Sequence, residues 1–546
     1  MKTKSRPSRK YLLFPVAIGL ILIGWSLASP VGSAPDEPSH VARAYSLVTG
    51  QQGLFPETDG LAAPLPEGFE GVGAGDAPYV LTQIPHYFVE KPRAGCYAFD
   101  PTKPAQECLP EITTDEVTVK GFQSYFVPGY ALFAGSLLRL TEVTGLAEIG
   151  GLTITRAISA FLNGVIVAWA LLLALPRTRW RFAGLIALLI LMPLTAFSLS
   201  SISPSSWEIS GTLLMTGALI AISRSRAQRV EVNSQRSADL RMAFAAVALG
   251  AFMAATARPF GLMWVATALV VSLILLRHLP RIVLALMGAL VALGVWWLVW
   301  SARFQREEIA DPFRASQGGL QPREILDFLL VGGANYFGRV LTVWSDYSNT
   351  GWIDTPTPAL LSLIWAFGWV IVIVGALSLN WVGAIHVGSN SRFLLWLGAA
   401  FGLSTFILFV FLFSYASFTV QSRHLLPGVL AAATCIGVLG LTARAAFAVK
   451  PKTVNSILFA STFGLAVAVV LSLLWTQWRY AYGLVIRDPV GLTTRTQEVA
   501  FWLPAGGLWL PPAVAAIGLV IAAFALRPSQ KNTAERVAGT SNTVAA

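Results

Sequence analysis

Residues 11–51 read "YLLFPVAIGLILIGWSLASPVGSAPDEPSHVARAYSLVTGQ", an apolar run that passes directly into a motif with two acidic residues and a histidine. The apolar part, 11–29, is long enough to cross about 30 Å of hydrocarbon as a helix. Asp36, Glu37 and His40 follow at the point where this helix would leave the bilayer. Ionisable side chains are costly next to lipid and tend to mark function there. The stretch therefore predicts a membrane-spanning helix with a candidate site at its outer end.

The rest of the chain repeats the apolar pattern. Of its 546 residues, 55% are hydrophobic and only 12% are charged, whereas ordinary soluble domains have about 25% charged residues. The further candidate spans are 152–175, 182–200, 207–223, 242–257, 260–276, 282–300, 359–379, 393–413, 425–443, 454–474 and 508–526. We therefore predict an all-α polytopic membrane protein with about 12 (11–13) transmembrane helices.

Basic clusters between the apolar runs predict the orientation. Loops rich in Lys and Arg stay in the cytoplasm, and such clusters occupy 176–181, 224–241, 277–281 and 444–452. Because the net charge of +11 gathers in these short loops, no nucleic-acid partner is expected. With a basic cytoplasmic leader at 1–10, both termini are predicted inside. The large loops 30–151, 301–358 and 475–507 are then extracytoplasmic.

Two stretches need separate treatment. Residues 124–140 are apolar enough to span, but a span here would invert every later loop, so we predict an interfacial helix in the first outer loop. Residues 242–276 are too long for one span at 1.5 Å per residue, and Pro259 and Gly261 favour a tight outer turn between two short spans. The transmembrane domain is predicted to cover 11–526, followed by a disordered cytoplasmic tail at 527–546.

Two of the three cysteines, Cys96 and Cys108, fall in the first outer loop. Disulfides form and persist on the oxidising side of a membrane. We predict that the two cysteines form a disulfide that pins this loop; two unpaired thiols are the alternative.

Other ionisable residues in or beside the spans fall mostly near the same outer ends. A carboxylate at this depth can act as general base on a hydroxyl, or can hold a divalent cation such as Mg²⁺ or Mn²⁺. Arginines there suit a lipid-linked phosphate, which the guanidinium group binds bidentately. The alternative is that Asp36 and Glu37 only favour the N-terminus of the next helix through its dipole. The residues concerned are Asp36, Glu37, His40, Arg156, Glu208, Arg258, Arg423 and His424.

Three separated motifs resemble those of one bacterial membrane family, called domain of unknown function 2142. The stretch "PDEPSHVARAYSLVTGQ" (35–51) resembles its opening motif, "GWIDTPTP" (351–358) agrees with a later stretch, and "VQSRHLLP" (420–427) is similar to its "QGRYxLP" signature. The resemblance covers residues 11–445. Ser422 and His424 stand where that signature has Gly and Tyr, so the loop geometry is expected to differ.

That family in turn resembles the GT-C glycosyltransferases. This resemblance implies a many-helix fold, a catalytic acidic residue in the first outer loop and polyprenyl-phosphate sugars as donors. It implies that Asp36 is the catalytic residue, helped by Glu37 or by a metal that these two would hold. Arg423, Arg258 and His424 would bind the donor phosphate. The supporting candidates are His40, Arg43, Arg156, Glu208, Arg339 and Asp354.

The function expected is an inverting glycosyltransferase at the outer face of the bacterial cytoplasmic membrane, with a glycan, lipid or protein of the cell envelope as acceptor. A transporter or flippase of envelope precursors is the rival from another class, although the sequence shows no paired half-chain motifs and few broken helices. A lipid-linked-glycan ligase is the rival enzyme, but its Arg and His would be expected in a large loop late in the chain. A non-catalytic scaffold of envelope assembly is the last alternative.

Overall fold

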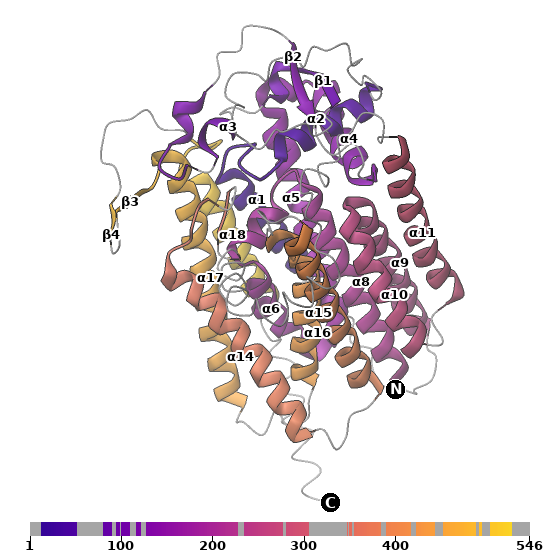
Figure 1. The fold of residues 1–546 in the computed structure, drawn as a ribbon. Helices are drawn as coiled ribbons and strands as arrows, with labels where there is room; N and C mark the ends of the chain where they lie inside the picture. The colour runs from indigo at the N-terminus through magenta and orange to yellow at the C-terminus, as the bar shows by residue number, and fades with distance from the viewer. Residues whose placement is uncertain are drawn as a thin grey trace, which may run out of the picture.

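A computed structural model gives the fold of the chain (Figure 1). It describes residues 12–526 except 52–79, 90–93, 99, 110–115, 122–126, 228–233, 277–279, 305–346, 348, 352–353, 384–388, 416–421, 443–450, 488–490 and 494–502. The predicted leader 1–10, the predicted tail 527–546 and the candidate Arg339 lie outside the described residues.

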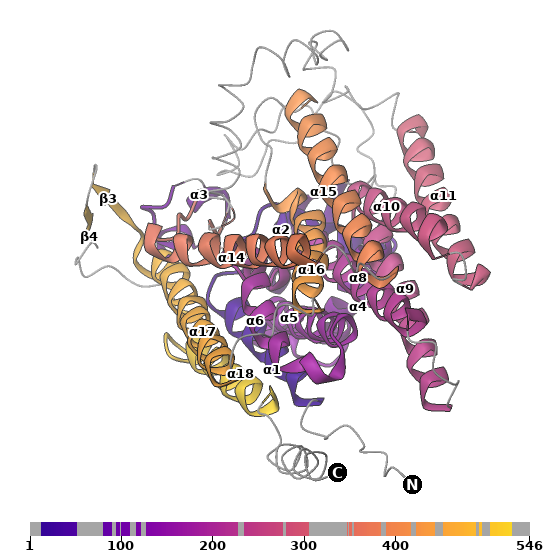
Figure 2. The same ribbon diagram turned by 90° about the horizontal axis from the view of Figure 1, so that it is seen from below.

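Most of the described chain is helical, as predicted. The apolar helices are α1 (Leu13–Leu27), α5 (Ala147–Ala174), α6 (Ala183–Ile190), α7 (Pro193–Leu199), α8 (Pro204–Ala227), α9 (Ser234–Ala257), α10 (Pro259–Leu275), α11 (Arg281–Phe304), α14 (Ala359–Gly383), α15 (Ser389–Tyr415), α16 (Leu426–Thr442), α17 (Pro451–Tyr482) and α18 (Leu510–Leu526). Long helices such as α8, α11 and α17 extend downward from the upper part of the molecule in Figure 1, α14 runs obliquely across its lower part, and Figure 2 shows the same bundle from below.

Among the described residues, five helices are long and apolar enough to cross a membrane, and a bent pair adds a sixth if it forms one span. The five are Ala147–Ala174, Asp239–Ala257, Arg281–Val299, Asn390–Leu412 and Asn455–Tyr482. Shorter apolar helices cover Leu13–Leu27, Pro259–Leu275, Ala359–Ile371, Leu426–Leu441 and Leu510–Leu526. The chain is thus an all-α membrane protein by length and composition. The count of about 12 spans stays a prediction.

The predicted span 182–200 is not one continuous helix, which corrects the sequence reading. A 3₁₀ turn, η4 (Arg177–Phe182), leads into α6, and α7 then starts at Pro193 after a bend of 92°. Proline is favoured in the first turn of a helix, but it has no N–H to bond to the preceding turn, so a helix cannot continue through it undisturbed. The bend carries α7 and the serines that follow it toward the connection between α1 and α2.

The predicted turn at residues 257–261 is confirmed, since α9 ends at Ala257 and α10 starts at Pro259. The interfacial segment is also helical: α4 covers Gly129–Val143. It lies beside α2 (Glu37–Thr49) at the upper end in Figure 1, where Gly135 abuts the backbone of Ala44. It has 15 residues, and its position relative to lipid stays a prediction.

The upper end also holds a small antiparallel sheet and several short turns. Strand β1 (Val80–Pro85) pairs with β2 (Glu116–Gly121), with Val80 opposite Gly121. The short elements are η2 (His86–Phe88), α3 (Ala94–Tyr97), η3 (Ala105–Cys108) and η6 (Ser422–His424). A second hairpin joins β3 (Val485–Arg487) to β4 (Gly491–Thr493). These elements, apart from the second hairpin and η6, come from the predicted first outer loop.

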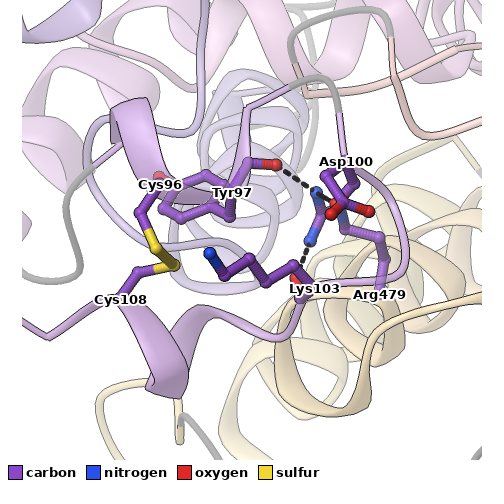
Figure 3. Close-up of a disulfide and its surroundings, with 6 residues drawn as sticks. All are labelled: Cys96, Tyr97, Asp100, Lys103, Cys108 and Arg479. Carbon is purple, nitrogen blue, oxygen red and sulfur yellow. Dashed lines mark hydrogen bonds between the residues drawn. A yellow bond between two sulfur atoms is a disulfide. The ribbon is translucent and has the colours of Figure 1, made fainter. Parts of the chain in front are cut away.

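The predicted disulfide between Cys96 and Cys108 is present (Figure 3). Beside it, Arg479 at the end of α17 donates hydrogen bonds to the carbonyls of Tyr97, Asp100 and Lys103 at 2.7–2.9 Å. Arg479 is fully buried. The disulfide cross-links the segment that contains Cys96 and Cys108, and the hydrogen bonds of Arg479 attach this segment to α17.

Candidate functional site

The connection between α1 and α2 takes its shape from Asp36. This residue has φ 63°, the one positive value outside glycine in the described part of the chain; Asp and Asn tolerate this conformation better than most residues. Asp36 makes no capping hydrogen bond to α2. Its Oδ2 instead accepts a hydrogen bond from Arg423 Nη2 at 2.7 Å. The carboxylate is therefore used in an ion pair and not as a helix cap.

Arg423 comes from η6, 387 residues along the chain from Asp36. It also donates through Nη1 to the carbonyl of Pro35 at 2.9 Å. The Arg423 side chain is only 7% exposed, whereas that of Asp36 is 33% exposed. The pair thus has a buried cation and a carboxylate that an incoming group can reach.

Glu37 is completely buried, and every group around its carboxylate is a donor. Oε2 accepts from the backbone N–H of Gly32 at 2.8 Å and of Ala34 at 3.4 Å. Oε1 accepts from the N–H of Ile202 at 2.7 Å and lies 3.2 Å from Arg156 Nε. Since both oxygens are occupied in this way, Glu37 is a weaker candidate than Asp36 for a base or a metal ligand.

Arg156, from α5, is the partner that holds Glu37 in place. Its guanidinium donates to the carbonyls of Ser29, Pro30 and Ser200 at 2.8–3.1 Å. It joins the end of α1, the segment after α7 and the acidic motif in one fully buried network. These contacts give Arg156 a structural part in the site.

A second pair forms between Arg258 and His424. Arg258 precedes α10, and its Nη1 lies 3.1 Å from His424 Nδ1. Arginine can only donate, so Nδ1 must be the acceptor and the proton of a neutral imidazole sits on Nε2. Phe260 packs against the imidazole edge-on at 5.7 Å. His424 is thereby fixed as a donor through Nε2.

Glu208 and His40 lie around these two pairs. Glu208, near the N-terminus of α8, is buried and accepts a hydrogen bond from Trp264 Nε1 at 2.8 Å. It is within electrostatic reach of both Arg258 and Arg423. His40 is within reach of the same two arginines and of Asp36. Four elements distant in sequence therefore converge on one charged cluster.

Arg43 follows on the buried part of α2, where its charge also acts on His40. It stays a supporting candidate at the edge of the cluster.

Electrostatics hold Asp36 ionised and the two histidines neutral. Burial raises the pKa of Asp36, but the opposing charges of Arg423 and Arg258, with the hydrogen bond from Arg423, outweigh it, and the pKa falls to about 2. Burial and the neighbouring Arg258 lower the pKa of His40 and of His424 well below the ordinary value. The cluster thus presents a carboxylate, two guanidinium groups and neutral imidazoles.

Asp354 is held by a different contact. It forms a buried ion pair with Arg479 Nη2 at 3.3 Å, and Thr355 Oγ1 donates to its Oδ1 at 3.0 Å. This ties the segment that contains Asp354 to α17 and gives Asp354 a structural partner. Its supporting role in the site stays a prediction.

Sequence reasoning missed Arg479 and the serine-rich segment 198–206. The predicted span ended at residue 474, so Arg479 fell in a loop, although a lone Arg beside an apolar run was a usable signal. Six serines in nine residues were a signal too. In the described residues no three His, Cys, Asp or Glu side chains gather as metal ligands.

Comparison with known proteins supports the resemblance seen in the motifs. A family model described as predicted membrane protein, DUF2142, matches residues 20–432. The chain belongs to this family. The match to DUF2142 includes both Asp36 and Arg423, and it ends before α17 and Arg479. No curated protein and no solved structure matches the chain.

Proposed function

We propose that this DUF2142 protein is an integral-membrane glycosyltransferase. It would move a sugar from a polyprenyl-phosphate donor to a hydroxyl group of a cell-envelope acceptor. The observation that carries the proposal is the ion pair of Asp36 with Arg423, next to Arg258 and His424, at one end of a bundle of apolar helices. A carboxylate able to take a proton and arginines able to bind phosphate meet there, and on the predicted topology a lipid headgroup would reach them.

The reaction is one displacement. The Asp36 carboxylate takes the proton of the acceptor hydroxyl while the hydroxyl oxygen forms a bond to the anomeric carbon. The bond from that carbon to the phosphate oxygen breaks, and the lipid phosphate leaves with the electron pair. Arg423 and Arg258 stabilise the negative charge that grows on the phosphate. Attack from the opposite side inverts the anomeric configuration, as in single-displacement glycosidases.

The Asp36–Arg423 ion pair would link binding of the sugar donor to the basicity of Asp36. A carboxyl with a pKa of about 2 is a weak base while Arg423 is its partner. If Arg423 turns toward the donor phosphate, Asp36 loses its strongest counter-charge, and its affinity for a proton rises. His424, with its proton on Nε2, can donate a hydrogen bond to the same phosphate. Donor binding would in this way activate the base.

The proposed setting follows the predicted orientation. The active site would face the extracytoplasmic side of the bacterial cytoplasmic membrane, with both termini inside. The donor would enter from the bilayer, and the acceptor, a glycan, a lipid or a protein, from the outer side. Glu37, Arg156 and Asp354 would position the loops and take no part in the transfer. A divalent cation at Asp36 is the remaining candidate cofactor.

One observation favours the transporter reading: the bend of 92° between α6 and α7, since broken helices are a feature of carriers. The charged cluster, however, lies at one end of the bundle, whereas carrier sites lie near the bilayer midplane. Transfer chemistry therefore fits better.

The test uses purified protein in proteoliposomes with radiolabelled polyprenyl-phosphate sugars and extracted envelope acceptors. We expect label on the acceptor, release of an equal amount of polyprenyl phosphate, and an inverted anomeric centre. A nucleotide sugar given in place of the lipid donor should transfer nothing. Movement of the intact lipid-linked sugar across the bilayer without cleavage would instead establish the flippase alternative.

A further inference from the structure

The serine-rich segment between α7 and α8 lines a small cavity beside the proposed active site. The segment is brought there by the bend before Pro193, and Pro35, next to Asp36, forms another part of the wall. The residues around the cavity are Ala34, Pro35, Leu194, Phe197, Ser198, Ser201, Ser203, Ser205 and Arg423. Its polar groups are thus hydroxyls and one guanidinium.

Two buried groups on this cavity have no hydrogen-bond partner among the described residues. One is the hydroxyl of Ser205, whose side chain is 1% exposed, and the other is Nε of Arg423. The two Nη groups of Arg423 donate hydrogen bonds to Pro35 and Asp36, so its Nε–H is the donor that stays unused. Buried polar groups are nearly always satisfied, so an unsatisfied pair facing one cavity calls for an explanation.

The N-terminus of α8 adds a positive potential. Ser203 caps this 24-residue helix by accepting the N–H of Ser205 at 3.3 Å. The helix dipole is equivalent to about half a positive charge at this end, which favours anions. A guanidinium N–H and a hydroxyl that lack a partner among the described residues therefore lie beside the positive end of a helix dipole.

We infer that Ser205, Arg423 and the N-terminus of α8 form an oxyanion subsite that takes one oxygen of a phosphate group. The small size of the cavity suits a single oxygen, with the rest of the phosphate toward Asp36 and Arg258. The inference rests on the proposed function only for the source of the phosphate, a lipid. A free phosphate would meet the same donors.

The test is a calorimetric titration of the purified protein in detergent with decyl phosphate, and separately with inorganic phosphate. We expect Ser205→Ala to weaken decyl phosphate binding about tenfold, as the loss of a hydrogen bond to a charged group does. Ser205→Asp should abolish binding, because its carboxylate would fill the cavity and pair with Arg423, while an acid in the first turn of α8 suits the dipole. Unfolding temperatures would show that each variant is folded.

Ser210→Ala is the matched control, since Ser210 lies on the same helix and its hydroxyl contacts Asn163 and the carbonyl of Ser206. It should bind decyl phosphate like wild type. Equal binding by wild type and Ser205→Ala, or no binding by wild type, would overturn the subsite, and sugar transfer measured separately would still judge the proposed function. Binding of inorganic phosphate as tight as that of decyl phosphate, lost in Ser205→Ala, would support the subsite and count against a lipid donor.

Discussion

Substitution of Glu37 by Gln tests whether the two adjacent acidic residues have different roles. The Glu37 carboxylate accepts hydrogen bonds from the backbone N–H groups of Gly32, Ala34 and Ile202 and forms an ion pair with Arg156. A glutamine side chain must place its NH₂ group where one of the two carboxylate oxygens now lies. In either orientation this NH₂ donor faces other donors, and they stay unsatisfied. The buried guanidinium of Arg156 also loses its counter-charge. Glu37→Gln is therefore expected to unfold more easily although it differs from glutamate by one atom.

The size of the effect follows from these contacts. Removal of one partner of a buried ion pair costs about 3–5 kcal/mol, and an unsatisfied buried donor alone costs about 1–3 kcal/mol. We therefore expect Glu37→Gln to lower the free energy of unfolding by about 3 kcal/mol. Asp36→Asn should cost less, about 1–2 kcal/mol: Arg423 loses its counter-charge but keeps its bond to the Pro35 carbonyl, Asp36 is partly exposed, and Asn also tolerates its positive φ.

The assay is reversible unfolding of the purified protein in mixed micelles, followed by circular dichroism for wild type and both variants. Glu37→Gln should unfold at clearly lower denaturant than Asp36→Asn. If Glu37→Gln is as stable as wild type, or less damaging than Asp36→Asn, the assignment of Glu37 to structure is wrong.

Three further predictions concern other contacts. Arg479→Met should lower the free energy of unfolding by about 3–5 kcal/mol because Asp354 loses its buried partner. Arg139→Met, at a half-exposed ion pair, should lower it by about 1 kcal/mol or less. Denaturant unfolding compares the two variants, and equal losses of unfolding free energy would refute the prediction. Gly164→Ala places a methyl 2.7 Å from the backbone of α1 and should cost about 1–3 kcal/mol. Gly288→Ala, inside α11, meets nothing within 4 Å and should keep or slightly raise the melting temperature, because Ala favours a helix more than Gly does. Because the pKa of Asp36 is lowered to about 2, its ion pair contributes fully to stability above about pH 4 and is lost as the pH falls through about 2. The difference in unfolding free energy between wild type and Asp36→Asn should therefore be the same at pH 5 and pH 7. A smaller difference at pH 5 than at pH 7 would contradict the lowered pKa.

Much of the site could be predicted because hydropathy and charge act locally. The apolar runs placed Asp36, Arg258, Arg423 and His424 at span ends on one side, and the structure brings these four together. The pairing of Cys96 with Cys108 followed from their shared outer loop. Each of these inferences needed only the position of a residue relative to the nearest apolar run.

Other features depend on tertiary contacts that no local pattern encodes. The Glu37 carboxylate is held in part by the backbone N–H of Ile202, 165 residues away, so sequence alone predicted Glu37 as a catalytic helper of Asp36 and gave no sign of its structural contacts. A hydropathy window averages across Pro193 and therefore reported one span where the chain bends. Arg479 is buried because the chain around Tyr97, Asp100 and Lys103 packs over it. An arginine after an apolar run can signal a special position, but it does not show which segment covers it.

The most direct test of the account is transfer by wild type and by Asp36→Asn. Both would receive a radiolabelled polyprenyl-phosphate sugar and envelope acceptors, with unfolding curves to show that both are folded and Ser210→Ala as a control that should retain activity. The account predicts transfer by wild type and a loss of at least about a hundredfold in Asp36→Asn, the typical contribution of a general base. Equal transfer by wild type and a folded Asp36→Asn would contradict the assignment of Asp36 as the base.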